Sequence, residues 1–523
     1  MQFHRPAGWM LATLMGVQTT AFAQIHTAQQ KTADGVLQGV VSADGQVRTF
    51  KGIPYAAPPV GELRWKAPQP VIPWQGVRNA SEYGARCMQG NIYSDMIFHD
   101  SGPSEDCLHL NLWMPANPTS ARLPVMVWIY GGGYQAGATS EGRQDGGNLS
   151  KRGVIVVSMD YRLGIFGFFS HPELAKEAGH NSSGNYGLMD QLAAIQWVKK
   201  NIATFGGDPD NVTIFGESAG SFSVSALVAS PLAKGLFKRA IGESGAYFAS
   251  TPLPLKSLAE TAKANADFAK TNLGTDSLAD LRAKSADELL QAATKQKGES
   301  FVPNVDGYFL PEDVLTIFAA GKQSLVPTLA GWNLDENPYR VIFGPDAPTA
   351  DNFLKHLQTL YGANAEQIAK LYAGSSEAEI KRAAGDLASD RFIAFGTWKW
   401  LEMTAKTDKV PVYRYEFDNT LPLAPDAPAG AEAMAPHASE IEFVFQMLSS
   451  RKLPWRPDDH TVSDLMAAYW SNFAKTGDPN GEGLPRWPLY TAKADYPVLH
   501  IGASPKAAPD AHRARYLLLD SLH

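Results

Sequence analysis

The chain has 523 residues, of which 44% are hydrophobic and 19% are charged, so it is long enough to bury a large core. Its formal net charge is −7 at pH 7, and it has no surplus of basic residues that could hold a phosphate backbone. We therefore expect no nucleic-acid partner.

Residues 1–23 have the features of a secretory signal peptide: a weakly basic start, a short apolar run at Trp9–Val17, and Ala21-Phe22-Ala23 as a small-x-small cleavage site. A membrane anchor is the alternative, but the apolar run is far shorter than the roughly 20 residues that span a bilayer. We predict a secreted or periplasmic protein that begins near Gln24 and has no stable membrane anchor.

The two cysteines, Cys87 and Cys107, lie 20 positions apart. An even cysteine count in an exported chain favours one disulfide, and two buried thiols are the alternative. Two cysteines without a histidine cluster do not make a zinc site. The sequence predicts no metal and no cofactor.

Strands dominate the first part of the chain. Short strands are predicted at Val36–Val41 and Arg48–Ile53, and an alternating one at Leu108–Leu112. Val125–Tyr130 and Val154–Val157 are almost entirely apolar, which is typical of central strands covered on both faces.

A helix is predicted at Asn185–Phe205, where apolar residues recur at helical spacing until Gly206 and Gly207 end it. A buried strand at 212–215 follows, and a helix of small residues comes after it at Ser221–Ala229. This alternation indicates a mainly parallel sheet.

The second half of the chain is richer in helices. The expected elements are helices within 255–320 and 350–408, strands at 325–330 and Val412–Phe417, an Ala/Pro-rich loop at Leu421–Pro436, and a helix at Met466–Phe473. Because no low-complexity linker separates the halves, we predict a single catalytic domain at 24–523 with inserted helical segments.

The sequence Gly216-x-Ser218-x-Gly220 lies between the predicted strand and helix, as a nucleophile elbow does. Its glycines are expected where side chains would clash between strand and helix. A serine in an ordinary tight turn is the alternative. The backbone N–H of Ala219 is one expected oxyanion donor, and the glycines at 131–133 after a buried strand are the other source.

A serine nucleophile needs a base and an acid that orients the base, and on this fold both follow the serine in the chain. The acids after the strand at 325–330 are Asp335 and Glu336. The later histidines are His356, His437, His460, His500, His512 and His523. The residue pattern alone leaves this choice open, although the loop position of His437 suits a base.

A dinucleotide site is the alternative interpretation of Gly131-x-Gly133-x-x-Ala136. We reject it because the residues that follow, 137–148, are polar and glycine-rich, and do not form a helix that could bind a pyrophosphate.

Several motifs together resemble those of the type-B carboxylesterases, the cholinesterase and carboxylesterase branch of the α/β-hydrolases, from about residue 33 to residue 500. They are Ser104-Glu105-Asp106-Cys107-Leu108, Tyr130-Gly131-Gly132-Gly133-Tyr134, Tyr161-Arg162-Leu163-Gly164, Asn185-Tyr186-Gly187-Leu188-Met189-Asp190-Gln191, Gly216-Glu217-Ser218-Ala219-Gly220 and Thr476-Gly477-Asp478-Pro479-Asn480. The resemblance implies a central, mostly parallel sheet flanked by helices, with helical insertions over the active site. It also implies hydrolysis of small-molecule esters through an acyl-enzyme, without a cofactor.

The resemblance also assigns residues. It implies Ser218 as nucleophile, Glu336 as acid, His437 as base, the amides of Gly132, Gly133 and Ala219 as oxyanion donors, a Cys87–Cys107 disulfide, and Ser244 with Glu440 as a buried serine–carboxylate pair behind the histidine. Glu243 departs from the family, in which a glutamine is usual at that position. With an ordinary histidine pKa of about 6.5, activity is expected to rise through neutral pH.

Alternatives to a general esterase are a lipase, an esterase for bulky aromatic or polycarboxylate esters, and a non-catalytic cholinesterase-like binding module. The presence of every triad member argues against the binding module. Eight aromatic residues lie near predicted active-site segments, and we favour packing as their role: Tyr134, Phe166, Phe168, Phe169, Tyr247, Trp332, Trp398 and Trp400. The sequence leaves the natural substrate and the oligomeric state open.

Overall fold

The computed structural model describes all residues except 3–26, 119, 121, 250–251, 296–300 and 523. The predicted signal peptide therefore lies almost wholly outside the described residues. Among the described helices, none combines the length and the apolar character that crossing a bilayer requires.

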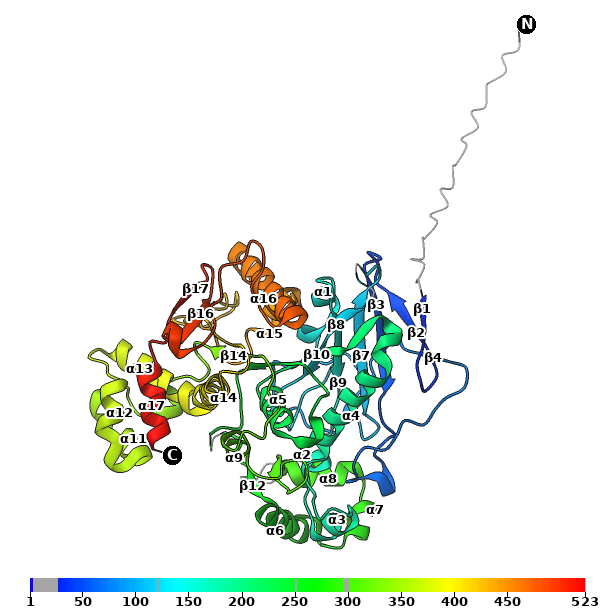
Figure 1. The fold of residues 1–523 in the computed structure, drawn as a ribbon, viewed down its shortest axis with the longest axis horizontal. Helices are drawn as coiled ribbons and strands as arrows, with labels where there is room; N and C mark the ends of the chain where they lie inside the picture. The colour runs from blue at the N-terminus through cyan, green and yellow to red at the C-terminus, as the bar shows by residue number, and fades with distance from the viewer. Residues whose placement is uncertain (3–26, 119, 121, 250–251, 296–300, 523) are drawn as a thin grey trace.

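A 13-stranded sheet runs through the molecule (Figure 1). In spatial order its strands are β1 (Thr27–Lys31), β2 (Val36–Val41), β3 (Val47–Pro54), β7 (His109–Pro115), β9 (Ile155–Met159), β8 (Leu123–Ile129), β10 (Gly207–Glu217), β11 (Arg239–Glu243), β14 (Thr328–Asn333), β15 (Val412–Phe417), β16 (Pro497–Ile501) and β17 (Lys506–Pro509), and β4 (Val77–Asn79) pairs with β2. From β9 to β16 every neighbouring pair is parallel, whereas the outer pairs along this path are antiparallel. The predicted, mostly parallel sheet is confirmed.

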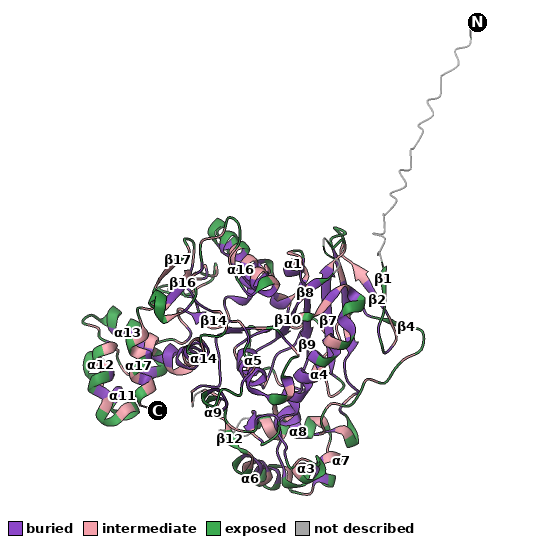
Figure 2. Ribbon diagram, in the orientation of Figure 1, coloured by how far each residue is buried: buried purple, intermediate pink, exposed green. Residues whose placement is uncertain are grey.

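Helices cover both faces of the sheet (Figure 1). On one face, α4 (Tyr186–Asn201), α5 (Ala219–Ala229) and α14 (Phe395–Ala405) pack on the strands. On the other face lie α1 (Gly147–Ser150), α15 (Ile441–Val444) and α16 (Pro457–Thr476). Burial follows this arrangement, since the strands are mostly buried while the outlying helices are largely exposed (Figure 2).

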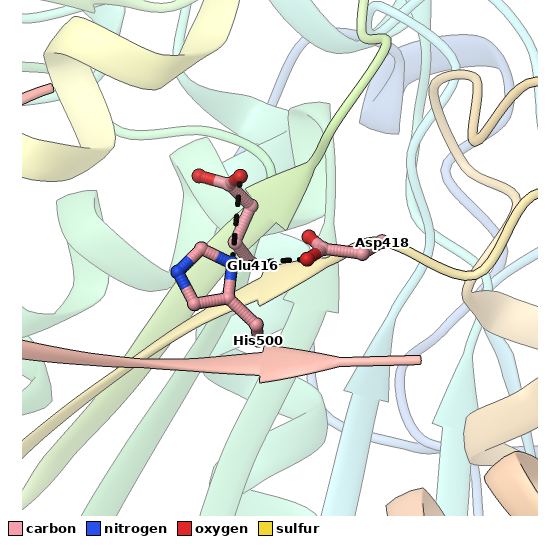
Figure 3. Close-up of side chains that lie close together, drawn as sticks. All are labelled: Glu416, Asp418 and His500. Atoms are coloured by element: carbon pink, nitrogen blue, oxygen red, sulfur yellow. Dashed lines mark hydrogen bonds and ion pairs between the residues drawn. The ribbon is translucent and has the colours of Figure 1, made fainter. Parts of the chain in front are cut away.

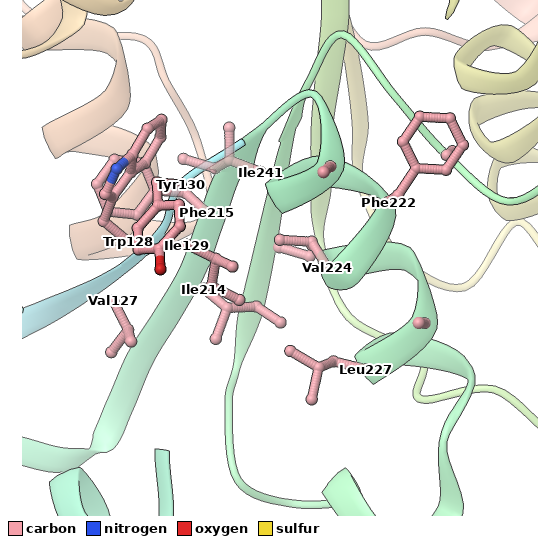
Figure 4. Close-up of a cluster of buried hydrophobic side chains, with 14 of the residues drawn as sticks. Val127, Trp128, Ile129, Tyr130, Ile214, Phe215, Phe222, Val224, Leu227 and Ile241 are labelled. Carbon is pink, nitrogen blue, oxygen red and sulfur yellow. The ribbon is translucent and has the colours of Figure 1, made fainter. Parts of the chain in front are cut away.

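The core beneath the elbow is apolar on both sides of the sheet (Figure 4). Val127 on β8, Ile214 on β10 and Leu227 on α5 are all fully buried. Double-sided burial explains why these strands have continuous apolar runs in place of alternation.

Two helical insertions interrupt the parallel strands. The insertion after β11 holds α6 (Leu258–Phe268), α7 (Leu278–Ala283), α8 (Ala286–Lys295) and α9 (Val314–Ala319). The insertion after β14 holds α10 (Arg340–Phe343), α11 (Ala350–Tyr361), α12 (Ala365–Leu371) and α13 (Glu377–Ser389), and continues through a π-helical turn at Asp390–Ala394 into α14. Ser257 and Ser376 begin α6 and α13 with capping boxes.

The remaining elements are short. They are α2 (Gly164–Phe168), α3 (Pro172–Glu177), α17 (Arg513–Ser521), and the paired strands β5 (Arg86–Cys87) with β6 (Pro103–Ser104) and β12 (Lys256–Ser257) with β13 (Asn304–Val305).

The strand predicted at 325–330 is displaced by three residues, because β14 begins at Thr328. Its six residues pair in register with all six of β15, so tertiary pairing sets its bounds. Gly331 belongs to the strand rather than to the following turn. A Cβ atom there would lie 2.3 Å from the carbonyl oxygen of Tyr415, so only glycine allows this close pairing.

Candidate active site

Ser218 lies at the junction of β10 and α5 and has φ 53° and ψ −123°, a backbone conformation that costs a non-glycine residue of order 1–3 kcal/mol. The flanking glycines make this turn possible. A Cβ atom on Gly216 would lie 2.6 Å from the carbonyl oxygen of Ile129, and one on Gly220 would lie 1.9 Å from the same atom. The prediction that side chains would clash at both positions is confirmed.

Three distant segments bring their side chains together at this turn. The Nε2 atom of His437 lies 2.9 Å from the Ser218 hydroxyl oxygen, and its Nδ1 atom lies 2.5 Å from Oε2 of Glu336. Because an ionised carboxylate can only accept, the proton of a neutral imidazole belongs on Nδ1, which leaves Nε2 as the acceptor that faces the Ser218 hydroxyl. Glu336 is fixed in turn, since its Oε1 accepts hydrogen bonds from the Ser244 hydroxyl at 2.6 Å and from the backbone N–H of Asn333 at 2.7 Å.

Main-chain contacts between the segments hold the histidine loop in place. The N–H of Asp335 donates to the carbonyl of Ala435, and the N–H of Ala435 donates to the Asp335 carboxylate at 2.9 Å. The exposed Ala/Pro-rich stretch is closed at its base, because the N–H of Leu421 donates to the carbonyl of Met434 at 2.7 Å. His437 therefore follows an anchored segment, not the free end of a long loop.

The other predicted candidates lie elsewhere. Asp335 forms an ion pair with Arg382. His356 pairs with Asp346 near α11, and His500 pairs with Asp418 at the end of β15. His460 and His512 lie on α16 and at the start of α17, and His523 lies outside the described residues.

Sequence reasoning assigned no role to Glu217, which the structure places directly beside the histidine. Its Oε1 atom lies 3.2 Å from Nε2 of His437, and its side chain is 4% exposed. Glu217 occupies the variable position of the Gly-x-Ser motif. An ionisable side chain next to the predicted nucleophile is the only feature of the sequence that could have pointed to a role for it. Burial raises the pKa of Glu217.

Electrostatics correct the expected pH dependence. Burial by itself lowers the pKa of His437, but the carboxylates of Glu217 and Glu336 outweigh burial and raise that pKa above its ordinary value. The expectation of an unshifted histidine is therefore wrong, because two carboxylates contact one imidazole.

The expected pairing of Ser244 with Glu440 is also wrong. Ser244 donates to Glu336, and Glu440 instead accepts a hydrogen bond of 2.5 Å from the side-chain amide of Asn333. Asn333 links the two carboxyl groups, since its backbone N–H binds Glu336 and its side chain binds Glu440. Glu243 is buried nearby and accepts a hydrogen bond from Trp470, and burial raises its pKa to about 8.

The glycine turn after β8 lies beside the elbow. Gly132 and Gly133 have positive φ values of 106° and 62°, and the N–H groups of Gln135 and Ala136 both donate to the carbonyl of Gly132. Within the part of the chain that the structure describes, no protein acceptor pairs with the N–H of Gly132 or Gly133. Ala219 is the first residue of α5, so its N–H has no acceptor within the helix.

A loop between the cysteines reaches these glycines. A Cβ atom on Gly133 would lie 3.3 Å from the Tyr93 hydroxyl, and one on Gly132 would lie 3.2 Å from the terminal methyl of Met96. The ring of Phe392, from the second insertion, contacts His437 edge-on with ring centroids 5.1 Å apart. None of these three neighbours is marked by a sequence motif, since each reaches the site only through the fold.

Residues 24–517 match the model of the Carboxylesterase family. The chain belongs to the carboxylesterase family. Para-nitrobenzyl esterase of Bacillus subtilis (strain 168) is 39% identical over 486 residues, which cover 89% of this chain and 92% of that protein. Fumonisin B1 esterase of Sphingopyxis macrogoltabida is 35% identical over 482 residues, which cover 89% of this chain and 85% of that protein.

Solved structures agree with this assignment. A thermophilic pNB esterase superimposes with a TM-score of 0.78 at 35% identity, covering 95% of this chain and all of that one. The carboxylesterase therefore has the α/β-hydrolase fold, as the resemblance implied, and it is a carboxylic ester hydrolase.

The predicted disulfide of this carboxylesterase is present between Cys87 and Cys107. The eight aromatic residues near the site are all buried to 4% exposure or less, as packing residues are. Trp332 and Trp398, for example, pack against Tyr516 of α17.

Proposed function

We propose that this carboxylesterase hydrolyses small-molecule carboxylic esters through an acyl-enzyme, with Ser218 as nucleophile, His437 as base and Glu336 as the orienting acid. The observation that carries the proposal is the continuous relay from the Ser218 hydroxyl through the imidazole to the carboxylate, at 2.9 and 2.5 Å. Both distances are within hydrogen-bonding range.

In the first half-reaction, Ser218 Oγ attacks the ester carbonyl carbon while its proton passes to Nε2 of His437. Glu336 accepts the Nδ1–H hydrogen bond and stabilises the imidazolium. The N–H groups of Gly132, Gly133 and Ala219 donate to the developing oxyanion; losing one such donor typically raises the barrier by about 3 kcal/mol. His437 then gives its proton to the leaving alcohol.

In the second half-reaction, a water molecule replaces the alcohol. His437 takes its proton, the resulting hydroxide attacks the acyl carbon, and the same amides bind the second oxyanion. Return of the proton to Ser218 Oγ releases the acid and restores the enzyme.

We also propose that residues 24–523 form one exported catalytic domain. The Cys87–Cys107 disulfide supports this location, because disulfides persist in oxidising compartments. The two relatives, para-nitrobenzyl esterase and fumonisin B1 esterase, are named for very different esters. We therefore propose no more than the class of substrate, a small-molecule carboxylic ester.

Replacing the nucleophile tests the triad. Ser218→Ala is expected to lower kcat for p-nitrophenyl acetate by at least about a thousandfold, because no other group can form the acyl-enzyme. The matched control is Ser225→Ala on the same helix, whose hydroxyl donates to the carbonyl of Phe222 and accepts from the backbone N–H of Tyr247, away from His437. Circular dichroism checks that both variants fold. Turnover by Ser218→Ala at the wild-type rate, or labelling of that variant by a fluorophosphonate, contradicts the proposal.

A further inference from the structure

Glu416, Asp418 and His500 meet at the end of β15, outside the triad (Figure 3). Glu416 and His500 are directly opposite each other in the parallel β15–β16 pair, so their side chains share one face of the sheet. Asp418 lies two residues beyond Glu416. Its backbone N–H donates to the carbonyl of Ile501, so the extended pairing with β16 continues as far as Asp418. Residues two apart in extended backbone share a face, so the side chain of Asp418 is on the same face as that of Glu416.

The ligand atoms of these three residues converge. His500 Nδ1 lies 2.9 Å from Oδ2 of Asp418 and 3.8 Å from Oε1 of Glu416, and all three atoms lie within 4.8 Å of one another. Ligands at about 2.1 Å from one tetrahedral ion are separated by roughly 3.4 Å, which is close to this spacing. We propose that Glu416, Asp418 and His500 bind a divalent transition-metal ion, with Zn²⁺ as the best match.

Burial of Glu416 is the independent reason to expect a cation. Its side chain is 6% exposed, and among the described residues it has no hydrogen-bond donor, only the long contact with His500. Separately, Oδ1 of Asp418 is buried without a hydrogen-bond partner among the described residues. A buried carboxylate without a donor is costly unless it is paired with a charge or coordinates a metal.

The positive charge of Arg414 favours the ionised form of Glu416, but among the described residues no basic side chain other than His500 forms an ion pair with Glu416. Arg414, two residues before Glu416 on the same strand, forms its ion pair with Asp510. Lys506 lies opposite His500 on β17, but it is exposed and forms no ion pair with either carboxylate in the described structure. A divalent cation would balance the two carboxylates.

The donor set selects among metals. Imidazole nitrogen is a good ligand for Zn²⁺, whereas Ca²⁺ and Mg²⁺ prefer oxygen ligands alone. His500 and Asp418 are each 30% exposed, so the ion would enter from solvent and complete its coordination with water. Asp418 is also the first residue of the segment 418–436, which leads from β15 to His437. A bound metal ion would therefore link the start of this segment to His500 on β16.

The test is zinc binding to tag-free protein stripped with EDTA, measured by isothermal titration calorimetry. We expect about one Zn²⁺ per chain and a higher thermal midpoint with Zn²⁺, because the ion binds the folded state. His500→Ala is expected to weaken Zn²⁺ binding at least tenfold. The matched control is His356→Ala, which removes a partly exposed histidine that pairs with a single aspartate, and it should bind Zn²⁺ within twofold of wild type.

A second variant guards against misfolding. Glu416→Gln keeps the side-chain shape, removes the charge, and should also weaken Zn²⁺ binding at least tenfold while the circular dichroism spectrum is unchanged. The proposal is overturned if wild type binds no Zn²⁺, if His500→Ala binds it as tightly, or if Ca²⁺ raises the thermal midpoint as much as Zn²⁺ does. Because binding is the readout, these outcomes are independent of whether Ser218 is the nucleophile.

Discussion

At the scale of single residues, the site is defined by how charge is distributed around His437. Two carboxylates, those of Glu217 and Glu336, contact its two ring nitrogens. Glu336 orients the ring for the proposed proton transfer, whereas Glu217 lies on the side where the proton arrives. The imidazolium that would form during the reaction therefore has a negative group at each end.

This arrangement predicts a shifted pH profile. Because both carboxylates favour the protonated imidazole, kcat/KM should rise with pH about a midpoint above the ordinary histidine value of about 6.5. Glu217→Gln removes one negative charge and should move the midpoint to lower pH. The measurement is kcat/KM against pH for both proteins, with exposed Glu62→Gln as control. A midpoint that stays fixed in Glu217→Gln would show that the two groups are not coupled.

At the scale of elements, the elbow depends on the close approach of β8, β10 and α5. Gly220, the second residue of α5, lies directly against the carbonyl of Ile129 at the end of β8. The strand-to-helix turn exists only while this position has no side chain.

We therefore expect Gly220→Ala to lower the free energy of unfolding by about 3 kcal/mol or more and to abolish activity, because the added methyl group meets rigid backbone. Gly385→Ala is the matched control: the added Cβ would lie no closer than 3.8 Å to any neighbouring atom, and α13 should be unchanged or stabilised by up to about 1 kcal/mol. Chemical denaturation of both variants measures the difference. Equal stability of the two would refute the steric explanation.

The elements themselves were largely predictable, because their signals are local. The apolar run at Val125–Tyr130 and the periodicity of Asn185–Phe205 correspond to β8 and α4 with small shifts at the ends. The strand at 325–330 was misplaced because its bounds come from pairing with β15, which no local pattern encodes.

The site was predictable only in part. Residue types and chain order favoured Ser218. The pattern left the choice among several later histidines open, although the loop position of His437 suited a base, and the assignment of His437 and Glu336 came from the family resemblance. The contacts of Tyr93 and Glu217 follow from the way loops and strand ends close on one another. The partner of Ser244 also follows from the fold. The sequence offered Glu440 and Glu336 as acceptors, and the Ser244 hydroxyl donates to Glu336.

At the scale of the whole molecule, the Cys87–Cys107 disulfide closes a surface loop and joins its start to the residues just before β7, an interior strand of the sheet. The loop spans 20 residues in sequence and carries Tyr93 and Met96 over the glycine turn. It contains little regular structure of its own, so the cross-link limits the conformations that it can adopt.

Replacing both cysteines by serine is expected to lower the free energy of unfolding by about 3 kcal/mol, which is the chain-entropy value for a loop of this length. The thermal midpoint of the double variant should fall, and a reductant should lower the wild-type midpoint to the same value. The double variant in reductant is the control, because it has no disulfide left to break. A wild-type midpoint that reductant does not change would mean that the cross-link contributes nothing to stability.

The contact between Leu421 and Met434 has an evolutionary consequence. Because this hydrogen bond joins the two ends of the Ala/Pro-rich loop, we expect insertions, deletions and substitutions among its exposed residues to leave the path of the chain into His437 unchanged. Natural drift can therefore vary the length and composition of this loop without disturbing the proposed relay from Ser218 through His437 to Glu336.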